Sequence, residues 1–131
     1  MNKIVKTDQE WKSLLTEDEY YVTRRKGTEP PFSGKNFKII NGGIFKCKCC
    51  GNELFNSSTK YDSYCGWPSF FEQISPEAIK TETDRSHGMV RIEIMCAKCD
   101  AHLGHVFDDG PEPTGKRYCV NSLSINYEEF E

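Results

Sequence analysis

The cysteines are the residues whose type and spacing most clearly indicate chemistry in this chain of 131 residues. There are seven, so at least one stays outside any internal disulfide. Four of them form two CxxC pairs, Cys47–Cys50 and Cys96–Cys99, and the other three are Cys49, Cys65 and Cys119. In a reducing compartment, such clusters usually bind a metal or take part in catalysis.

The two CxxC pairs predict a zinc site with the ligands Cys47, Cys50, Cys96 and Cys99. Each pair follows a segment with strand character and ends in a tight turn, so four thiolates can converge on one ion, as in structural Zn²⁺ sites. An iron–sulfur cluster also accepts four thiolates, but two evenly paired turns favour zinc. Buried free thiols and a thioredoxin-like redox pair are the alternatives, and the latter needs a long following helix that the sequence does not predict. We interpret Cys49, inside the first pair, as a bystander thiol.

Cys119 lies in a segment, residues 115–122, with polar neighbours on both sides. If this segment is a strand, Arg117, Cys119 and Asn121 share one face, because side chains alternate with a period of two. A cation two residues away lowers the pKa of a thiol, and Asn121 adds a hydrogen-bonding amide. A cysteine packed in a core is the alternative, which these polar neighbours disfavour.

Two histidines upstream could serve this thiol. His102 and His105 are followed by Phe107, Asp108 and Asp109, a denser polar group than a solvated turn requires. Histidine is the natural proton donor near neutral pH. A metal role is less attractive, because four sulfurs already complete the zinc site.

Cys65 lies in a loop that Gly66 and Pro68 enforce. A thiol on a loop flanked by glycine can move toward a second thiol. Trp67 and the aromatic residues after it cluster behind the loop. We interpret Trp67 either as a core residue or as the wall of a small apolar pocket.

The elements that must position these residues are mainly strands. Strand patterns cover residues 43–47, 89–95, 102–107 and 118–127. In the second of these, the apolar residues at positions 90, 92 and 94 fall on one face, and Arg91 and Glu93 on the other. The sequence therefore predicts a mainly β fold.

A helical arm precedes the strands. Two capping boxes, Thr7-x-x-Glu10 and Thr16-x-x-Glu19, predict helices over residues 8–15 and 17–26, and Gly27 is expected to end the second. Ser75-Pro76-Glu77 predicts one further helical turn. We expect one domain over residues 1–131, with the arm in about residues 1–30 and the β core in about residues 43–127.

The composition excludes several classes of protein. A net charge of −3 argues against a nucleic-acid partner, because phosphate binding needs a basic patch. No apolar run reaches the roughly 18 residues of a membrane span. Residues 1–6 lack the apolar region of a signal peptide, so a cytoplasmic location is expected.

These segments resemble the B-type methionine sulfoxide reductases, which act on the R epimer of the sulfoxide. The matching stretches cover nearly the whole chain: Leu15-Thr16-Glu17, Arg25-Lys26-Gly27-Thr28-Glu29, Pro31-Phe32-Ser33-Gly34, Cys47–Gly51, Gly66-Trp67-Pro68-Ser69-Phe70, Cys96–Gly110 and Arg117–Ser122. Three positions depart from the family pattern. Tyr64 stands where Gly is expected, Leu123 where Ala is expected, and Cys49 is an additional thiol. Tyr64 is expected to alter the mobility of the loop beside it.

The resemblance implies two antiparallel β-sheets leaning together, with a four-cysteine zinc site on the side away from the active site. It implies that Cys119 is the nucleophile, that Cys65 is the resolving cysteine and that Trp67 holds the substrate methyl group. The polar wall of the implied site consists of His102, His105, Asp109, Arg117 and Asn121. Phe107 is expected to join Trp67 and Asp109 in binding the substrate.

The implied activity is the reduction of methionine-R-sulfoxide in oxidised proteins and peptides, a repair of oxidative damage. The Cys119 thiolate would attack the sulfoxide sulfur while His102 or His105 protonates the oxygen. The resulting sulfenic acid would condense with Cys65 to a disulfide, which thioredoxin would reduce.

A non-catalytic binding module is the main rival interpretation. It would use the same β architecture and zinc, with Cys65 and Cys119 incidental and the aromatic residues forming a static cage. A zinc ribbon that binds nucleic acid is a weaker alternative, because the net charge is negative. Incubation with a methionine sulfoxide and a dithiol distinguishes an enzyme from either module.

Overall fold

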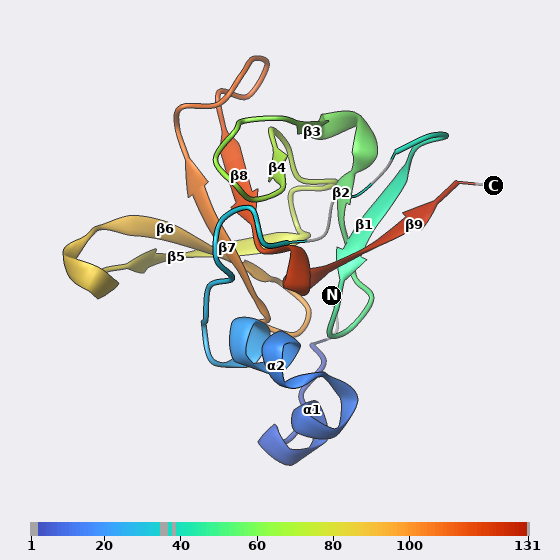
Figure 1. Cartoon of the computed structure of the whole chain (residues 1–131), viewed down its shortest axis with the longest axis vertical. Coiled ribbons are helices and arrows are strands. Elements are labelled where there is room, and N and C mark those ends of the chain that lie inside the picture. The colour runs from blue at the N-terminus through green and yellow to red at the C-terminus, as the bar shows by residue number, and fades with distance from the viewer. Residues whose placement is uncertain (1–2, 35–36, 38, 131) are drawn as a thin grey trace.

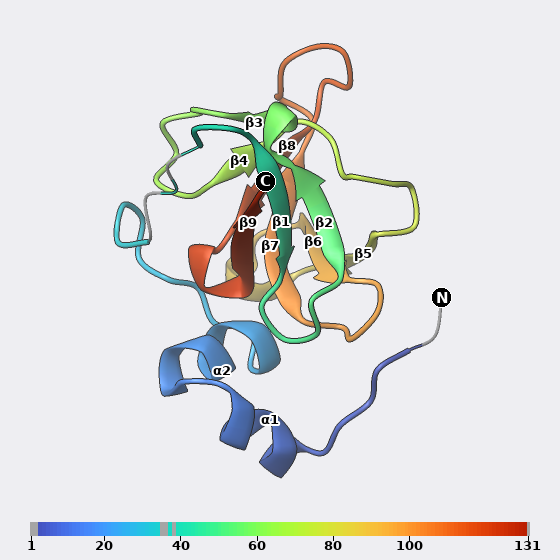
Figure 2. The same cartoon turned by 90° about the vertical axis from the view of Figure 1, so that its right-hand side faces the viewer.

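The computed structural model describes residues 3–34, 37 and 39–130 of the chain. Within these residues, two short helices precede nine strands (Figures 1 and 2). The elements are α1 (Asp8–Leu14), α2 (Glu17–Arg24), β1 (Gly43–Cys47), β2 (Glu53–Asn56), β3 (Lys60–Tyr61), β4 (Ser69–Phe70), β5 (Ile79–Asp84), β6 (Arg91–Cys96), β7 (His102–Phe107), β8 (Arg117–Val120) and β9 (Ile125–Glu129). The predicted mainly β fold with a helical N-terminal arm is confirmed.

The strands form two antiparallel sheets, as the resemblance implies. One has three strands in the order β2-β1-β9, and the other has six in the order β3-β4-β8-β7-β6-β5. Figures 1 and 2 show the two sheets inclined to each other, with both helices at one end of the molecule.

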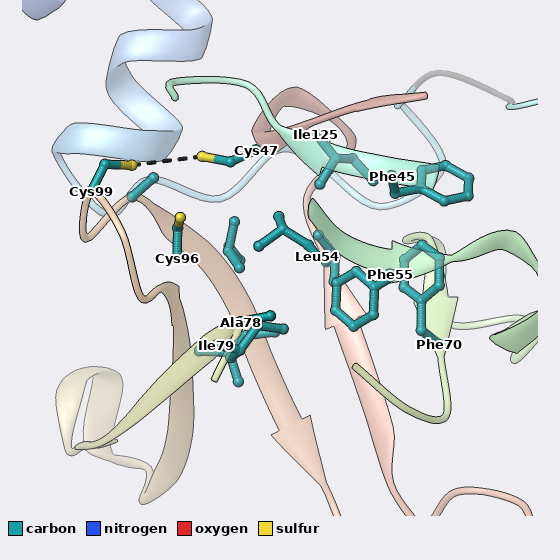
Figure 3. Close-up of a cluster of buried hydrophobic side chains, with 14 of the residues drawn as sticks. Phe45, Cys47, Leu54, Phe55, Phe70, Ala78, Ile79, Cys96, Cys99 and Ile125 are labelled. Atoms are coloured by element: carbon teal, nitrogen blue, oxygen red, sulfur yellow. Dashed lines mark hydrogen bonds between the residues drawn. The ribbon is translucent and has the colours of Figure 1, made fainter. Parts of the chain in front are cut away.

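A core of buried aromatic side chains joins the two sheets. The rings of Phe55 from β2 and Phe70 from β4 are stacked, with their centroids 4.1 Å apart (Figure 3). The ring of Phe45 from β1 meets that of Phe70 edge-on at 5.0 Å. Burying one such side chain stabilises a fold by about 1.5–3 kcal/mol. The packing therefore fixes β4 against the three-stranded sheet, and β4 is the neighbour of β8, which carries Cys119.

Both helices begin at the predicted capping boxes. The side chains of Thr7 and Thr16 accept hydrogen bonds from the backbone N–H groups of Glu10 and Glu19, and the two glutamates bond back to the caps. Such a cap stabilises a helix by about 1 kcal/mol. Trp11 is the buried residue of α1 and anchors the arm to the core.

The helices end slightly earlier than the sequence predicts, and the end of α2 differs in detail. Lys26, with φ 57°, takes the left-handed conformation expected of Gly27. Gly27 is favoured for another reason. A Cβ atom there would lie 2.2 Å from the ring of Tyr21, so a larger residue would force that exposed ring to move.

The strand predicted over residues 89–95 begins later, at Arg91, and pairs with β5 in regular register, so Ile92 and Ile94 share one face and Arg91 and Glu93 the other. Burial does not follow these faces. Val90 and Ile92 are 67% and 39% exposed, whereas Glu93 and Ile94 are 2% and 0% exposed. The first residues of β6 lie beyond the core. The carboxylate of Glu93 contacts partners on one face of the six-stranded sheet, and these are described below.

The predicted strand over residues 118–127 is two strands. A single 3₁₀ turn at Ser122–Ser124 separates β8 from β9, and the chain passes there from the six-stranded to the three-stranded sheet. The predicted helical turn near Ser75 is present as a hydrogen-bonded turn, in which the N–H of Ala78 donates to the C=O of Ser75 at 3.2 Å. None of the helices in the described ranges is long and apolar enough to cross a membrane.

Candidate active site and metal centre

Strand pairing places one residue from each of four strands in a row on one face of the six-stranded sheet. Ser69 of β4 lies opposite Cys119 of β8, Cys119 lies opposite His105 of β7, and His105 lies opposite Glu93 of β6. Directly paired residues in antiparallel strands carry their side chains on the same face, with Cβ atoms about 4.5–5.5 Å apart. The predicted nucleophile and a predicted proton donor are therefore cross-strand neighbours.

A bulge at Leu103 brings His102 onto the same face. The pairing of β7 with β6 shifts by one residue between Gly104 and His102, and this leaves Leu103 as the extra residue. In a regular strand, residues three apart point to opposite faces. Here Leu103 is fully buried in the core, and the rings of His102 and His105 lie 5.7 Å apart between centroids.

Gly104 permits the close approach of β7 to β8 at Cys119. A Cβ atom at this position would lie 1.9 Å from the carbonyl oxygen of Cys119. Its φ of 157° is also one that residues with side chains rarely adopt. The strand that carries both histidines can therefore pair with β8 only because residue 104 is glycine.

Cys65 and Cys119 are in contact although they lie far apart in the chain. Their Sγ atoms are 3.4 Å apart. The hydroxyl of Ser63 donates to Cys65 Sγ at 3.0 Å and lies 2.7 Å from the hydroxyl of Ser69. The Ser69 hydroxyl is itself 3.4 Å from Cys65 Sγ. Two hydroxyl groups thus hold the loop thiol against the thiol of β8.

The two thiols differ in their tendency to ionise. Burial disfavours the thiolate of Cys65, but hydrogen bonds from Ser63 and Ser69 outweigh burial and lower its pKa to about 7. Burial, followed by the charge and hydrogen bond of Cys65, raises the pKa of Cys119 to about 12. Cys65 is therefore the more acidic thiol of the pair.

Arg117 lowers the pKa of Cys119, as predicted, but the net shift of that pKa is upward. Its guanidinium lowers the pKa of Cys119, and burial together with Cys65 overrides it. The guanidinium bonds the carboxylate of Asp109 at 2.9 and 3.2 Å and lies over the ring of Phe107 at 4.3 Å. Three predicted site residues therefore form one group, in which Asp109 and Phe107 hold the arginine.

His102 belongs to a buried chain of polar groups. Its Nδ1 lies 2.7 Å from Oε2 of Glu93, and the other carboxylate oxygen, Oε1, lies 3.2 Å from the Nζ of Lys26. His102 and Glu93 are 4% and 2% exposed. Burial lowers the pKa of His102, although Glu93 opposes this effect. Glu93 therefore orients the ring of His102 through Nδ1.

His105 is oriented by a different carboxylate. Its Nε2 lies 2.8 Å from Oδ2 of Asp84 at the end of β5, and the same oxygen lies 3.5 Å from the guanidinium of Arg91. The hydrogen bond with His105 is the largest cause of the lowered pKa of Asp84. Each histidine therefore has one nitrogen paired with a carboxylate and one left over, the arrangement of an oriented proton donor.

Asn121 lies one residue beyond the end of β8 at Val120. Its buried amide accepts a hydrogen bond from the N–H of Glu29 at 3.1 Å and donates to the C=O of Leu103 at 3.1 Å. Asn121 therefore ties the bulge of β7 to the loop after α2.

Trp67 is held by Glu29, the loop residue that also bonds to Asn121. Its Nε1–H donates to the backbone C=O of Glu29 at 3.0 Å. The buried carboxylate of Glu29 accepts hydrogen bonds from the Ser122 hydroxyl at 2.9 and 3.0 Å and from the N–H of Leu123 at 2.9 Å. Glu29 thus connects Trp67 to the segment that directly follows Cys119.

Trp67 lines a pocket of about 360 Å³ beside the Cys65 loop. Tyr61, Tyr64, Phe32 and Ser69 also line this pocket. A larger cavity of about 490 Å³ lies between α2 and the start of β9, and none of the predicted site residues lines it.

The sequence analysis did not predict five polar residues of the site, because the pattern around each of them is weak. They are Glu29, Ser63, Ser69, Asp84 and Glu93. Two serines near a cysteine are ordinary in a loop, and the acidic residues stand in segments rich in exposed charge. Strand pairing brings Ser69, Asp84 and Glu93 to the thiols and histidines, and Glu29 reaches the site through the loop after α2.

The four cysteines of the two CxxC pairs converge as predicted. The Sγ atoms of Cys47, Cys50, Cys96 and Cys99 all lie within 4.8 Å of one another. The pairs Cys47–Cys99 and Cys50–Cys96 are each 3.6 Å apart, and Figure 3 shows the first of them. Zn–S bonds of about 2.3 Å in a tetrahedron require S···S distances of about 3.8 Å. The donor set and its spacing therefore fit a structural Zn²⁺ ion.

The helical arm covers one side of this cluster. The guanidinium of Arg24 lies 3.8 Å from the sulfur of Cys99 and donates to its backbone C=O at 3.0 Å. Cys49, half-buried, interacts with Cys47 and Cys99 but is not one of the four converging sulfurs. Its interpretation as a bystander stays a prediction.

Comparison with solved structures shows a shared fold. The crystal structure of the Mis18 'Yippee-like' domain matches with a TM-score of 0.55 at 17% identity, covering 69% of this chain and 98% of that domain. At this identity the match concerns the fold alone.

Comparison with protein families is more specific. The SelR domain family matches residues 15–129. The peptide methionine sulfoxide reductase MsrB of Hahella chejuensis is 58% identical over 127 residues, which are 97% of this chain and 91% of the relative. The peptide methionine sulfoxide reductase MsrB of Acinetobacter baylyi is 56% identical over 131 residues, 100% of this chain and 94% of the relative. The chain belongs to the SelR family, together with these B-type methionine sulfoxide reductases.

Proposed function

We propose that this chain reduces methionine-R-sulfoxide in oxidised proteins and peptides to methionine, with Cys119 as the nucleophile and Cys65 as the resolving thiol. The observation that supports it most is the 3.4 Å contact between these two sulfurs on a sheet face that also carries two carboxylate-paired histidines. Membership of the SelR family supports the same activity. A static binding module has no use for two thiols in contact.

In the first step the sulfur of Cys119 attacks the sulfoxide sulfur. The Cys119 thiol first loses its proton to solvent, which Arg117 favours and which burial and Cys65 oppose. The oxygen moves to Cys119, so the substrate gains two electrons and leaves as methionine, while Cys119 becomes a sulfenic acid. His102 or His105 donates a proton to the oxygen during this transfer.

The second step closes the catalytic disulfide. Cys65 attacks the sulfenic acid of Cys119, the S–S bond forms, and the oxygen leaves as water. An external dithiol then reduces the disulfide by exchange, and we propose thioredoxin for this role. The disulfide forms when Cys65 returns to the position beside Cys119 that it occupies in the reduced protein.

The substrate is held between an apolar and a polar wall. Trp67 takes the methyl group, and His102 and His105 face the oxygen, so only one epimer places its sulfur toward Cys119. Arg117, supported by Asp109 and Phe107, favours negative charge at Cys119. Asn121 acts by positioning the strand ends around the thiol.

The remaining features have supporting roles. Cys47, Cys50, Cys96 and Cys99 hold a structural zinc ion, which stabilises the ends of β1 and β6 and takes no part in electron transfer. We propose that residues 1–131 act as one domain. Cysteines that are all free are compatible with a reducing cytoplasm, which we propose as the location.

An assay with separated epimers tests the proposed function. The protein is incubated with dithiothreitol and either N-acetyl-methionine-R-sulfoxide or its S epimer, and methionine product is measured. We expect turnover of the R epimer alone. The Cys119→Ser variant serves as the matched control and is expected to be inactive but folded. Turnover of both epimers, or activity that survives in Cys119→Ser, would contradict the proposal.

A further inference from the structure

Phe32 and Tyr64 stand out as the most exposed aromatic side chains in the described part of the chain. They are 78% and 82% exposed. Both also have left-handed backbone, with φ of 64° and 59°. This conformation costs free energy for residues with a side chain, and such strain tends to occur where ligands are held. Neither ring is needed for the core, so the strained backbone and the exposure call for another explanation.

Local hydrogen bonds maintain both strained positions. The N–H of Phe32 donates to the C=O of Gly66 at 2.7 Å, and the N–H of Tyr64 donates to the side chain of Asp62 at 2.9 Å. A Cβ atom on Gly66 would lie 3.1 Å from the Phe32 ring, so this ring packs on the residue that follows Cys65. Tyr64 directly precedes Cys65. The two aromatic residues therefore lie next to Cys65, Tyr64 before it in the chain and Phe32 against Gly66 after it.

The two rings also border the pocket that contains Trp67. Phe32, Tyr64, Trp67 and Tyr61 all line this pocket of about 360 Å³. Its charged lining residues, Lys60 and Asp62, are of opposite sign, so the pocket does not select a ligand by net charge. A concave pocket lined by several aromatic side chains accepts side chains rather than a flat protein surface.

We propose that Phe32 and Tyr64, the aromatic rim, bind apolar residues that flank the oxidised methionine in a polypeptide substrate. The proposal rests on the proposed function, because a sulfoxide that reaches Cys119 must carry its neighbouring residues across the surface beside Cys65. Aromatic side chains bury a large area and lose little conformational entropy when they bind. The aromatic rim thus makes an unfolded apolar segment a better substrate than a polar one.

The test compares two blocked pentapeptides with a central methionine-R-sulfoxide, one flanked by Leu and one by Ser, together with N-acetyl-methionine-R-sulfoxide. Dithiothreitol is the reductant, so no protein reductant is needed. We expect kcat/KM to be about tenfold higher for the Leu-flanked peptide than for the Ser-flanked peptide, mainly through KM.

Substitutions at the aromatic rim should remove this preference. Asn tolerates left-handed backbone, so Phe32→Asn combined with Tyr64→Asn removes the rings without new strain. We expect the Leu-to-Ser ratio to fall to about twofold or less, and Tyr64→Phe, which keeps the ring, to retain the wild-type ratio. Val90→Asn removes an exposed apolar side chain from the end of β6 and is expected to retain the ratio as well.

An unchanged ratio in the double variant would overturn the proposal, as would a wild-type protein without any preference. A double variant that keeps the Leu-to-Ser ratio but loses thioredoxin-supported turnover would also overturn the proposal. The aromatic rim would then bind the reductant and not the substrate. Failure of the proposed function looks different, since N-acetyl-methionine-R-sulfoxide would then give no methionine with the wild-type protein.

Discussion

The sulfur of Cys65, on a loop, lies 3.4 Å from the sulfur of Cys119, on β8, so the two thiols are already in contact in the reduced protein. A disulfide of about 2.05 Å requires the sulfurs to approach by roughly a further 1.4 Å. Substrate, in contrast, needs the space around Cys119 that Cys65 occupies. The loop that carries Cys65 must therefore move away from Cys119 during the first step and return to it in the second.

The hydroxyl of Ser63 is expected to control the ionisation of Cys65. It donates to Cys65 Sγ and is among the groups that lower the pKa of that thiol to about 7. Ser63→Ala should therefore raise this pKa and move the pH at which Cys65 becomes alkylated upward from about 7. Iodoacetamide labelling of Cys65 across pH 5–10, read by mass spectrometry, checks this. A midpoint that stays near 7 would show that Ser63 has no such role.

Glu93 is expected to position His102 as a proton donor. Glu93 raises the pKa of His102 against the effect of burial. Glu93→Gln should therefore lower that pKa, and activity that needs protonated His102 should disappear at a lower pH. We expect kcat to fall by about tenfold or more while KM changes little.

A second variant of the same chain provides the control for this prediction. Lys26, 64% exposed at its side chain, lowers the pKa of His102, so Lys26→Gln should move the basic limb of the pH profile in the opposite direction. The pH dependence of kcat for both variants is the measurement. Shifts of the same sign in both variants would exclude an effect through His102.

The zinc cluster is expected to contribute stability and not chemistry. Cys96→Ser removes one of four converging thiolates and should lower zinc content and Tm together, because metal binding is coupled to folding. Metal analysis and thermal unfolding of the same preparation check this. A variant that loses its zinc but keeps its full Tm would refute the structural role.

Gly104 is expected to be indispensable for the pairing of β7 with β8. Gly104→Ala would place a Cβ atom 1.9 Å from the Cys119 carbonyl oxygen, so we expect a loss of about 3 kcal/mol or more in the free energy of unfolding. Gly115→Ala is the matched control, since its φ is also positive and no atom lies within 4 Å of its added Cβ. There we expect about 1 kcal/mol. Equal losses in urea unfolding would contradict this account of Gly104.

The sequence was sufficient for features that local patterns or spacing encode. The capping boxes at Thr7 and Thr16 specify where the helices begin, because the cap satisfies local backbone groups. The spacing within the CxxC pairs predicted the metal cluster, since two sulfurs of one turn already lie close together. The overall fold and the family followed from motifs spread along the chain.

Features that depend on strand register could not be predicted. The burial of Glu93 follows from its place opposite His105 and from the bulge at Leu103, and no local pattern marks either. The pKa of Cys119 is another example. The nearby Arg117 predicted a low value, but burial and Cys65, which is distant in sequence, raise it.

The division of labour between the two thiols is tested most directly by single turnover of Cys65→Ser. Without reductant, this variant should release about one methionine per enzyme and stop with Cys119 as a sulfenic acid, which a trapping reagent detects. The first step should not slow, because removal of Cys65 lowers the pKa of Cys119 relative to the wild type. Dithiothreitol should recycle the variant and thioredoxin should do so poorly. No methionine in the single turnover, or thioredoxin-supported turnover at the wild-type rate, would contradict the assignment of Cys119 as nucleophile and Cys65 as resolving thiol.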